Sequence, residues 1–303
     1  MGSGDPSGLQ NRRELASLAL VSSTLTRFRQ KFMYAIRHVL AIGLIVGSAH
    51  PQTRPHVANS QSNYLGFDRN VYPGDAAMDE LRKTFSFTGY WLNAPPGSAS
   101  SNWLGKRTLL GEKGFGFLVL FNGRSYAQLK KGDPRALGEM DGKEAVRLAG
   151  VEGFPSRSII FLDQEEGGRL LPEQRSYLHA WVDAVTKAGY GAGVYCSGIA
   201  SKEAGRATVT TARDIRENAD ARKIEFFVAN DQCPPSPGCV KSAPPPAGSG
   251  IEFARVWQFA QSPRRKQYAT SRARSYAKDG NCYAGNIFVD LDAATSADPS
   301  RGR

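Results

Sequence analysis

Histidine is scarce in this chain, and its scarcity argues against several kinds of active site. The four histidines are His38, His50, His56 and His179, and the first three lie before residue 60. A Ser-His-Asp triad, a Cys-His pair and a histidine-rich zinc site all require imidazole, so these sites are disfavoured. The phosphate-binding loop G-x₄-G-K-[ST] and internal repeats are absent as well. We therefore predict no metal and no cofactor, and carboxylate chemistry is what these exclusions leave.

Cysteine is also sparse, at four residues: Cys196, Cys233, Cys239 and Cys282. An even number in an exported chain suggests disulfides, for which four cysteines allow three connectivities. Cys233 and Cys239 bracket the turn-rich segment CPPSPGC, which favours a local bridge between them and leaves Cys196 and Cys282 unassigned. Neither pair has C-x₂-C spacing, so a zinc site is the weaker alternative.

The N-terminal leader has no apolar run long enough for an ordinary transmembrane helix. A basic segment, RFRQKFMYAIRH, precedes the short apolar run 39–49, and this order is typical of a signal peptide cleaved near Ala49. We predict a leader at 1–49, a linker at 50–62, and a secreted or periplasmic protein without a stable membrane span after cleavage. An uncleaved membrane anchor is the competing interpretation, and Arg12–Arg13 matches a twin-arginine signal only poorly.

Basic charge is concentrated in two places. The net charge is +11, of which residues 1–49 carry +4. Most of the rest comes from the basic segment 262–278, whose cationic residues are Arg264, Arg265, Lys266, Arg272, Arg274 and Lys278. Such a stretch favours an anionic surface such as a cell-wall polymer or nucleic acid, although a solvated loop has the same composition.

Apolar runs alternate with amphipathic segments from residue 63 onward. Strands are expected at 64–70, 87–92, 116–122, 158–165, 190–197, 223–231, 254–260 and 286–292. Helices are expected at 76–84, 102–112, 141–153, 171–189 and 211–221. This alternation predicts a TIM-type (β/α)₈ barrel over 63–293, with a reduced helix between strands seven and eight and a disordered tail at 294–303. An open doubly wound sheet would normally show a glycine-rich nucleotide loop after its first strand, and GFDRN is not one.

The segment SIIFLDQEEGG, residues 158–168, is the centre of the predicted site. An apolar run typical of a buried parallel strand ends in Asp163, Glu165 and Glu166. Strand alternation would place Asp163 and Glu165 on the same face. Neighbouring carboxylates disfavour each other's charged form, which is what general acid chemistry requires. An acidic turn that caps the following helix is the alternative.

Other strand ends carry further acids and flat polar side chains. In a barrel of this kind, sites form at the carboxyl ends of the strands. The additional acids are Asp68, Asp231, Asp290 and Asp292, and the aromatic and amide residues are Tyr90, Trp91, Asn122, Tyr195, Trp257 and Gln258. Rings can cover the apolar face of a sugar while acids bind its hydroxyls, so this set predicts a sugar-binding cleft.

Five motifs give the chain a resemblance to known families. GFDRN, FLDQEEGG, GVYCSG, VWQF and FVDLD stand in the order seen in family 25 glycoside hydrolases, which are lysozyme-type muramidases with a (β/α) barrel. The chain is even more similar to a related exported bacterial glycoside-hydrolase-like barrel domain of unknown function. The resemblance covers about residues 63–293. One departure is Asp290-Leu291-Asp292, where the lysozymes usually have Asp-x-Asn.

The resemblance implies roles for particular residues. Glu165 is the implied general acid, and Asp163 would orient the substrate or stabilise positive charge at the anomeric carbon. Asp68 and Asp290 would support this pair, although each could instead cap a helix or form a salt bridge. Tyr195 and Trp257 would line sugar subsites, although Trp257 could equally be a core residue. Glu166 is the chief rival of Glu165.

Three functions are compatible with these features. The first is an exported glycosidase acting on peptidoglycan or a similar amino-sugar polysaccharide. The second is a non-catalytic barrel that binds cell-wall glycan. The third is a nucleic-acid-binding protein that uses the basic segment 262–278, and we do not expect nucleic acid to be a partner. The sequence does not define the oligomeric state.

Overall fold

The computed structural model describes residues 62–203, 208–265 and 275–303. The predicted leader 1–49, nearly all of the predicted linker 50–62, and residues 266–274 of the basic segment lie outside the described residues. None of the helices within the described ranges is both long and apolar enough to cross a membrane.

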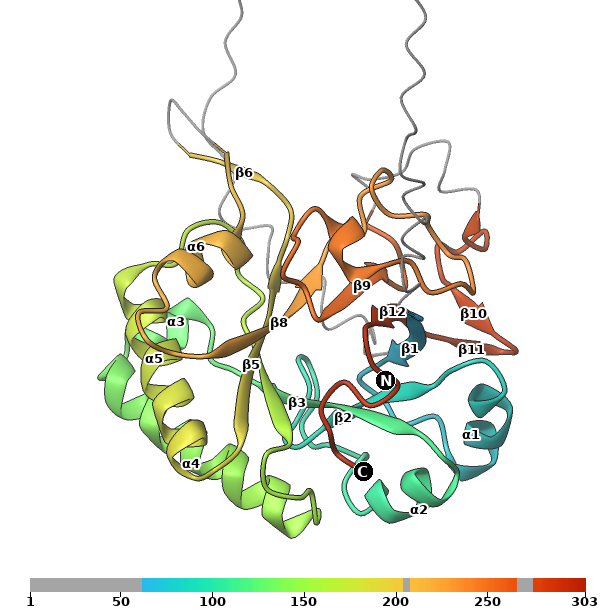
Figure 1. The fold of residues 1–303 in the computed structure, drawn as a ribbon, viewed down its shortest axis with the longest axis horizontal. Coiled ribbons are helices and arrows are strands. Elements are labelled where there is room, and N and C mark those ends of the chain that lie inside the picture. Colours follow the sequence, from blue (N-terminus) through green and yellow to red (C-terminus); the bar gives the residue numbers. More distant parts are fainter. Residues whose placement is uncertain (1–61, 204–207, 266–274) are drawn as a thin grey trace, which may run out of the picture. The chain divides into compact units, whose positions relative to one another are not determined.

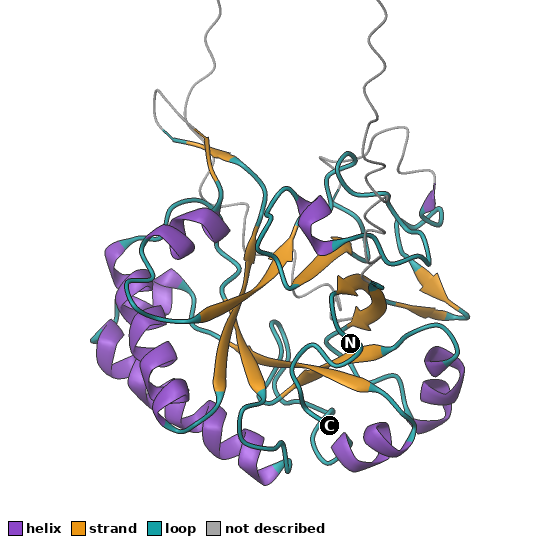
Figure 2. Ribbon diagram, in the orientation of Figure 1, coloured by secondary structure: helices purple, strands orange, loops and turns teal. Residues whose placement is uncertain are grey.

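Eight strands form a closed barrel, which confirms the predicted fold class (Figures 1 and 2). Their order around the barrel is β1-β12-β9-β8-β5-β4-β3-β2. The barrel strands are β1 (Tyr64–Asp68), β2 (Phe87–Trp91), β3 (Gly116–Asn122), β4 (Ile159–Asp163), β5 (Gly191–Ser197), β8 (Ile224–Ala229), β9 (Val256–Ala260) and β12 (Asp290–Ala294). Nearly all of their residues are buried, since helices cover one face and the barrel interior fills the other.

The last barrel strand differs from the expected all-parallel arrangement. β12 pairs antiparallel with both β1 and β9, whereas the other neighbouring strands are parallel. The expected strand 286–292 is divided between β11 (Ile287–Phe288), which pairs with β10 (Tyr283–Ala284), and β12. A short hairpin therefore reverses the chain before the last strand, and β12 begins, rather than ends, at Asp290.

Helices cover the outside of the barrel. They are α1 (Asp75–Arg82), α2 (Arg107–Glu112), α3 (Tyr126–Leu129), α4 (Pro134–Val151), α5 (Pro172–Lys187) and α6 (Thr211–Glu217), with the 3₁₀ turn η1 (Pro246–Ser249). The short strands β6 (Ser201–Lys202) and β7 (Thr208–Val209) form a separate hairpin. Between β9 and β12, the described residues form the β10–β11 hairpin where a further outer helix would stand.

Helix α4 begins seven residues before the expected start at 141. Asp133 is its N-cap, and its carboxylate accepts a hydrogen bond from the Arg135 N–H at 2.9 Å. Pro134 follows at the first helical position, where its fixed φ angle suits the helix and its missing N–H costs nothing. The Asp-Pro pair was therefore a readable start signal that hydrophobic periodicity alone did not reveal.

Two glycines allow α4 to pack closely on α5 (Figure 1). A Cβ atom at Gly138 would lie 2.3 Å from the Tyr177 carbonyl oxygen, and one at Gly142 would lie 2.8 Å from the Ala184 Cβ. Asp141 lies between them and accepts a hydrogen bond from the Tyr177 hydroxyl at 2.8 Å. The two backbones can approach this closely only because both positions lack side chains.

We predict that Gly138→Ala lowers the free energy of unfolding by about 1–3 kcal/mol, because the added methyl overpacks the α4–α5 contact. Gly150→Ala in the same helix is the matched control, since nothing lies within 4 Å of the added Cβ. This control should stabilise the protein by about 0.5–1 kcal/mol through helix propensity alone. Urea unfolding of both variants tests the contact, and equal effects of the same sign would contradict it.

The C-terminal segment is ordered, so the expected disordered tail at 294–303 is wrong. Ala294 belongs to β12, and Ser300 is fully buried. The Ser300 carbonyl accepts the Ile159 N–H at 2.7 Å, and its hydroxyl accepts the Val119 N–H at 2.8 Å. The segment therefore crosses the amino-terminal ends of β3 and β4 and satisfies backbone donors there.

Candidate active site

Seven barrel strands each contribute one side chain to a small cavity at the carboxyl ends of the parallel strands. The residues that line it are Asp68, Trp91, Leu120, Asp163, Tyr195, Phe227 and Gln258. Five of these were predicted site residues. The cavity volume of about 10 Å³ is room for about one water molecule. These side chains therefore form a packed polar floor rather than an open pocket for a sugar ring.

Gln258 connects the floor from one side of the barrel to the other. Its Nε2 donates to Asp68 Oδ2 at 2.8 Å and to Asp290 Oδ2 at 3.4 Å. Its Oε1 accepts hydrogen bonds from the Tyr195 hydroxyl at 2.7 Å and from Gln261 Nε2 at 2.8 Å. A buried amide with both ends satisfied is a fixed element, so Gln258 sets the relative positions of two acids and the tyrosine.

Asp290 is placed by the reversal of the chain before β12. It lies opposite Asp68 in the β1–β12 register, and its Oδ1 accepts the Ser262 N–H at 2.5 Å. The Ser262 hydroxyl donates to the Val289 carbonyl at 2.6 Å and accepts the Cys282 N–H at 2.9 Å. Ser262 thus joins the end of β9 to the hairpin that leads into β12.

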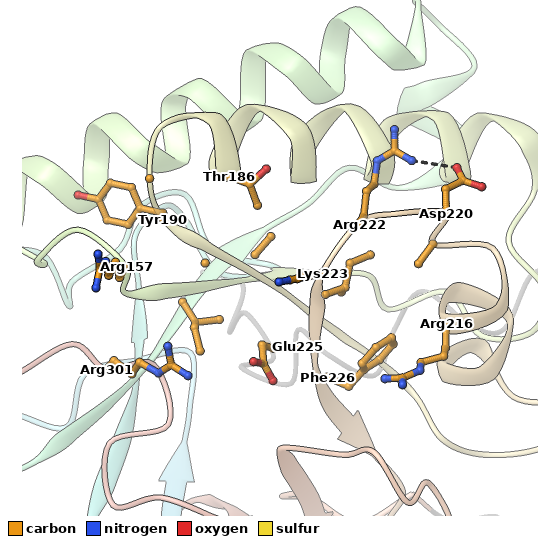
Figure 3. Close-up of a pocket in the computed structure, with 16 residues that line it drawn as sticks. Arg157, Thr186, Tyr190, Arg216, Asp220, Arg222, Lys223, Glu225, Phe226 and Arg301 are labelled. Atoms are coloured by element: carbon orange, nitrogen blue, oxygen red, sulfur yellow. Dashed lines mark hydrogen bonds and ion pairs between the residues drawn. The ribbon is translucent and has the colours of Figure 1, made fainter.

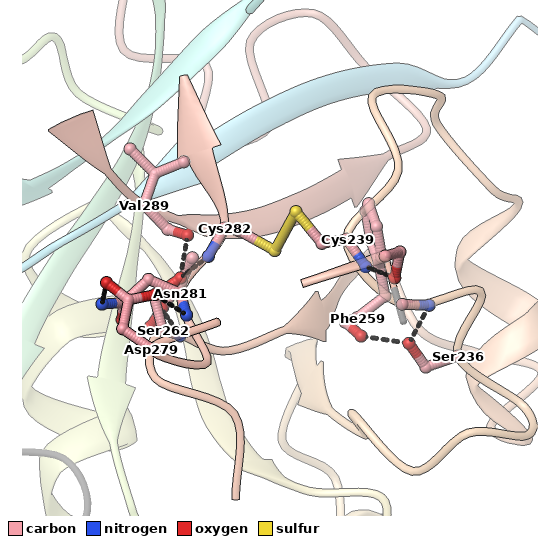
Figure 4. Close-up of a disulfide and its surroundings, with 11 residues drawn as sticks. Ser236, Cys239, Phe259, Ser262, Asp279, Asn281, Cys282 and Val289 are labelled. Atoms are coloured by element: carbon pink, nitrogen blue, oxygen red, sulfur yellow. Dashed lines mark hydrogen bonds between the residues drawn. A yellow bond between two sulfur atoms is a disulfide. The ribbon is translucent and has the colours of Figure 1, made fainter. Parts of the chain in front are cut away.

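A disulfide secures the same hairpin (Figure 4). It joins Cys239 to Cys282, with a Cα–Cα distance of 5.5 Å. The predicted local bridge between Cys233 and Cys239 is therefore wrong, and Cys196 and Cys233 are buried outside any disulfide. The sequence signal was misleading because the spacing of CPPSPGC favours a local loop, whereas the hairpin that carries Cys282 is brought beside Cys239 only by barrel closure.

Three buried carboxyl groups lie together at the β1–β12 edge. Burial raises the pKa of Asp68 to about 6, although hydrogen bonds from Gln258 and Asp292 oppose the shift. Burial, followed by the charge of Asp68, raises the pKa of Asp290 well above its ordinary value. The Ser262 N–H and the charges of Arg69 and Arg265 act in the opposite direction on Asp290.

Asp292, a strand-end acid that was given no catalytic role from the sequence, is the deepest of these acids. It is fully buried and pairs with Gly66 and Gln258 in the strand registers. Among the described residues, no N–H or O–H donor reaches either of its oxygens. Burial and the charges of Asp68 and Asp290 raise its pKa well above the ordinary value. Burial and the neighbouring charges therefore favour the protonated form of Asp292 in the folded protein.

The charges of all four predicted catalytic acids raise the pKa of one hydroxyl group, that of Tyr195. The pKa of Tyr195 is raised well above its ordinary value by burial and then by the charges of Asp163, Asp68, Glu165 and Asp290. Asp163 also lies directly opposite Tyr195 in the β4–β5 register. Acids separated by more than 200 residues in the chain are thus gathered around Tyr195 at one rim of the barrel.

Glu165 and Glu166 have different environments. β4 ends at Asp163, so Glu165 does not share a strand face with Asp163 as expected, but follows it in the loop and is half-buried. Glu166 accepts hydrogen bonds from the Tyr126 N–H at 3.0 Å and from the Gln174 amide. These bonds tie the first residue of α3 to the first turn of α5. Glu166 is therefore a structural link, whereas Glu165 lies beside the floor.

Two aromatic residues predicted to line the cleft are core residues instead. Tyr90 is fully buried, its ring packs against Phe154 and Phe117, and its hydroxyl donates to Glu152. The Trp257 Nε1 donates to the Asn230 carbonyl at 2.8 Å on the outside of the barrel. Strand alternation explains both corrections, because the neighbouring residues Trp91 and Gln258 are the ones that face the interior.

Asn122 and Cys196 do not line the cavity. The Asn122 Nδ2 donates to the Ala94 carbonyl at 2.8 Å and its backbone N–H donates to Asn93 Oδ1 at 2.7 Å, so it fastens the loop after β2. Burial raises the pKa of the Cys196 thiol far above its ordinary value, which disfavours the nucleophilic thiolate.

In the described part of the chain, no cluster of His, Cys, Asp and Glu is arranged to hold a metal ion.

The fold and the acids at its rim define a closed α/β barrel of the glycoside-hydrolase-like class. Residues 107–276 match the family model described as the Rv2525c-like, glycoside hydrolase-like domain, and the chain belongs to this family. The match includes Asp163, Glu165 and Tyr195, whereas Asp68 and Asp290 lie outside the matched residues. A search of curated proteins found no match.

Solved structures with a similar fold include three of different origin. An uncharacterized protein from B. stearothermophilus is 19% identical over 76% of this chain and 95% of its own, with a TM-score of 0.49. The Tat-secreted protein Rv2525c from Mycobacterium tuberculosis, in complex with HEPES, is 16% identical over 80% and 98%, with a TM-score of 0.47. The modular autolysin LytC from Streptococcus pneumoniae, in complex with a synthetic peptidoglycan ligand, is 13% identical over 76% and 46%, with a TM-score of 0.44.

The raised pKa values predict how stability depends on pH. A carboxyl group whose pKa is higher in the folded state keeps its proton longer there than in the unfolded chain. Its contribution to stability is complete below about pH 4, the unfolded value, and is lost as the pH rises through the folded value. For Asp68 this window runs from about pH 4 to about pH 6, and the melting temperature should fall across it.

Asp292→Asn tests the buried acid directly. We expect the variant to be more stable than the wild type at pH 7 by about 1–3 kcal/mol, because a neutral amide removes the buried ionisable group. The difference should shrink at about pH 3, below the ordinary aspartate pKa, where Asp292 is largely protonated in both states. Asp79→Asn, at an exposed acid, is the control. Thermal unfolding at both pH values provides the measurement, and the same change in stability at about pH 3 as at pH 7 would contradict the assignment.

Proposed function

We propose that this protein is an exported glycosidase that acts on a β-linked amino-sugar polymer of the cell wall, such as peptidoglycan. The observation that carries the proposal is the position of Asp68, Asp163 and Asp290 at one end of the barrel. Asp68 and Asp163 line one cavity, Gln258 donates hydrogen bonds to Asp68 and Asp290, and Glu165 follows Asp163 in the loop after β4. Paired carboxylates are the groups that glycoside hydrolysis uses most directly. Membership in a glycoside-hydrolase-like family supports the same reaction class, and the family 25 relationship is part of this proposal.

The arrangement suggests a division of roles. The floor has room for about one water molecule, so a sugar ring would lie above it, beside the half-buried Glu165. Glu165 would donate a proton to the glycosidic oxygen. Asp163, in the floor below, would stabilise positive charge at the anomeric carbon or orient the N-acetyl group. Asp68 and Asp290, fixed through Gln258, would act as positioning residues.

Export is the second part of the proposal. The Cys239–Cys282 disulfide supports it, because disulfides persist mainly in oxidising compartments outside the cytoplasm. The signal-peptide pattern at 1–49 points in the same direction. The proposed partner is therefore a wall glycan, and nucleic acid is not expected to bind.

A non-catalytic glycan-binding barrel is the second candidate. The small volume of the floor favours it, because Asp68, Tyr195 and Gln258 hydrogen-bond to one another there without a ligand. Such a protein would hold glycan at the rim without turnover. The two candidates agree on where the glycan binds and differ on whether it is cleaved.

Glu165→Gln separates the two candidates. We expect the wild type to release reducing ends from purified cell wall or from chitin oligosaccharides, and the variant to lose at least about 100-fold in rate because the proton donor is gone. Glu139→Gln is the matched control, since Glu139 is exposed on α4 and forms a surface salt bridge with Lys143. Glycan binding by the wild type without release of reducing ends would contradict the catalytic proposal and leave the binding barrel.

Glu166→Gln provides an independent check on the assignment of the acid. Glu166 bridges α3 and α5, so this variant should lower the melting temperature while its rate per folded molecule stays near that of the wild type. Circular dichroism and the reducing-end assay, run below the melting temperature of the variant, give both quantities. A loss of rate as large as that of Glu165→Gln would assign the acid to the wrong residue.

A further inference from the structure

A second concave surface lies at the opposite end of the barrel from the acid cluster. Its walls include Ile159, Gly191 and Ile224, which are the first residues of β4, β5 and β8. It has a volume of about 720 Å³, within the range of pockets that hold small organic ligands. We call it the basic groove. The proposed glycosidase reaction makes no use of it.

The charge of the basic groove is strongly positive (Figure 3). Five cationic side chains line it against two acidic ones: Arg157, Arg216, Arg222, Lys223 and Arg301, against Asp220 and Glu225. The two acids already have cationic partners. Asp220 accepts from Arg222 at 3.0 Å, and Glu225 lies 3.7 Å from Arg255. Neither therefore neutralises the remaining cations of the groove.

Four of these cations have no carboxylate within salt-bridge distance among the described residues: Arg157, Arg216, Lys223 and Arg301. Figure 3 shows Arg157 and Arg301 on one side of the groove, and Lys223 between them and the Arg222–Asp220 pair. The cations therefore approach the same space from different directions. An anion in that space would meet several donors at once.

Backbone geometry gives an independent reason to regard the groove as a site. In the described part of the chain, the non-glycine residues with positive φ are Arg157 at 72°, Asp220 at 53° and Arg301 at 54°. All three line the basic groove. This conformation is unfavourable for residues with a Cβ atom, and such residues cluster at functional sites.

Hydrogen bonds hold the two arginines in this conformation. The Arg157 N–H donates to the Gly189 carbonyl at 2.9 Å, and the Arg301 N–H donates to the Asp298 carbonyl at 3.0 Å. The Ser158 hydroxyl donates to the Arg301 carbonyl at 3.1 Å, which joins the two segments. Glycine would adopt the same positive φ angles without strain. The backbone conformation therefore does not account for the presence of arginine at these two positions.

We propose that the basic groove binds an organic phosphate. Arginine guanidinium groups match phosphate oxygens in a bidentate fashion, and lysine adds a point charge. The volume exceeds what inorganic phosphate alone would fill, so the ligand carries an organic part. That part would lie against the Tyr190 and Phe226 rings, which also line the groove. The phosphate belongs either to a soluble molecule or to a lipid headgroup.

The experiment measures binding to the intact protein by isothermal titration calorimetry. The soluble probes are glucose 6-phosphate, inorganic phosphate and glucose, and the lipid probe is a vesicle containing phosphatidylglycerol. We expect glucose 6-phosphate to bind more tightly than inorganic phosphate, and glucose not to bind. Vesicle binding that is abolished by the same variants would support the groove and place the phosphate in a lipid headgroup.

Arg157→Gly and Arg301→Gly separate a ligand-binding role from a structural one. Each should leave the melting temperature unchanged or raise it, because glycine relieves the positive-φ strain. Each should weaken glucose 6-phosphate or vesicle binding by about tenfold, and the double variant by more. Arg147→Gln is the charge-matched control, since Arg147 is on α4 outside the groove and pairs with Glu144.

Several results would overturn the proposal. One is the absence of binding of both glucose 6-phosphate and vesicles at millimolar phosphate. Another is equal binding by the wild type and the double variant, or an equal loss in Arg147→Gln. Binding of double-stranded DNA without binding of either phosphate probe would assign the groove to a different class of partner. None of these results depends on whether the protein cleaves glycan.

Discussion

The antiparallel closure of the barrel by β12 is the constraint on which the site depends. Because β12 runs against its neighbours, its first residue lies at the same rim as the last residues of the parallel strands. Asp290 therefore stands opposite Asp68, and Asp292 lies opposite Gly66, two pairs deeper in the barrel. A parallel eighth strand would place the start of the strand, and with it Asp290, at the other rim. The β10–β11 hairpin and the Cys239–Cys282 disulfide stabilise this reversal.

Closure of the barrel brings the carboxyl groups of Asp68, Asp290 and Asp292 together. Their burial and proximity favour the protonated forms. Gln258 donates to two of the acids, and the Ser262 N–H donates to Asp290. Asp292 has no comparable donor, and burial raises its pKa well above the ordinary value. The cluster is therefore costly for stability at neutral pH, and such a cost is typical of functional sites. The register of β12 therefore underlies the chemistry that we propose at the rim.

The sequence predicted the barrel and most of the acids for clear physical reasons. Apolar runs that end in a carboxylate identified β1 and β4, and helix termini with Pro172 and Gly189 identified α5. Neighbouring side chains in a strand face opposite sides of the sheet, so Trp91 and Tyr90 cannot both line the cavity, nor can Gln258 and Trp257. All four residues were nevertheless assigned to the site from the sequence.

Other features depend on contacts between distant residues and leave no local pattern. The pairing of Cys239 with Cys282 requires the hairpin to fold back on the Pro-rich loop. The order of the C-terminal tail follows from the backbone donors of β3 and β4 that it satisfies. The basic groove combines residues from three separated segments, around Arg157, Lys223 and Arg301. In each case the sequence shows the residues, whereas the closed barrel brings them together.

The most direct test of the acid cluster is a pH titration of its carboxyl groups by ¹³C NMR. Burial and mutual proximity predict that Asp68 titrates at about pH 6 and that Asp290 and Asp292 titrate well above the ordinary aspartate value. Their titration curves should also depend on one another, so that Asp292→Asn shifts the curve of Asp68. Independent titration of all three groups near pH 4 would show that the acids are solvated and separate, and the proposed site would be wrong.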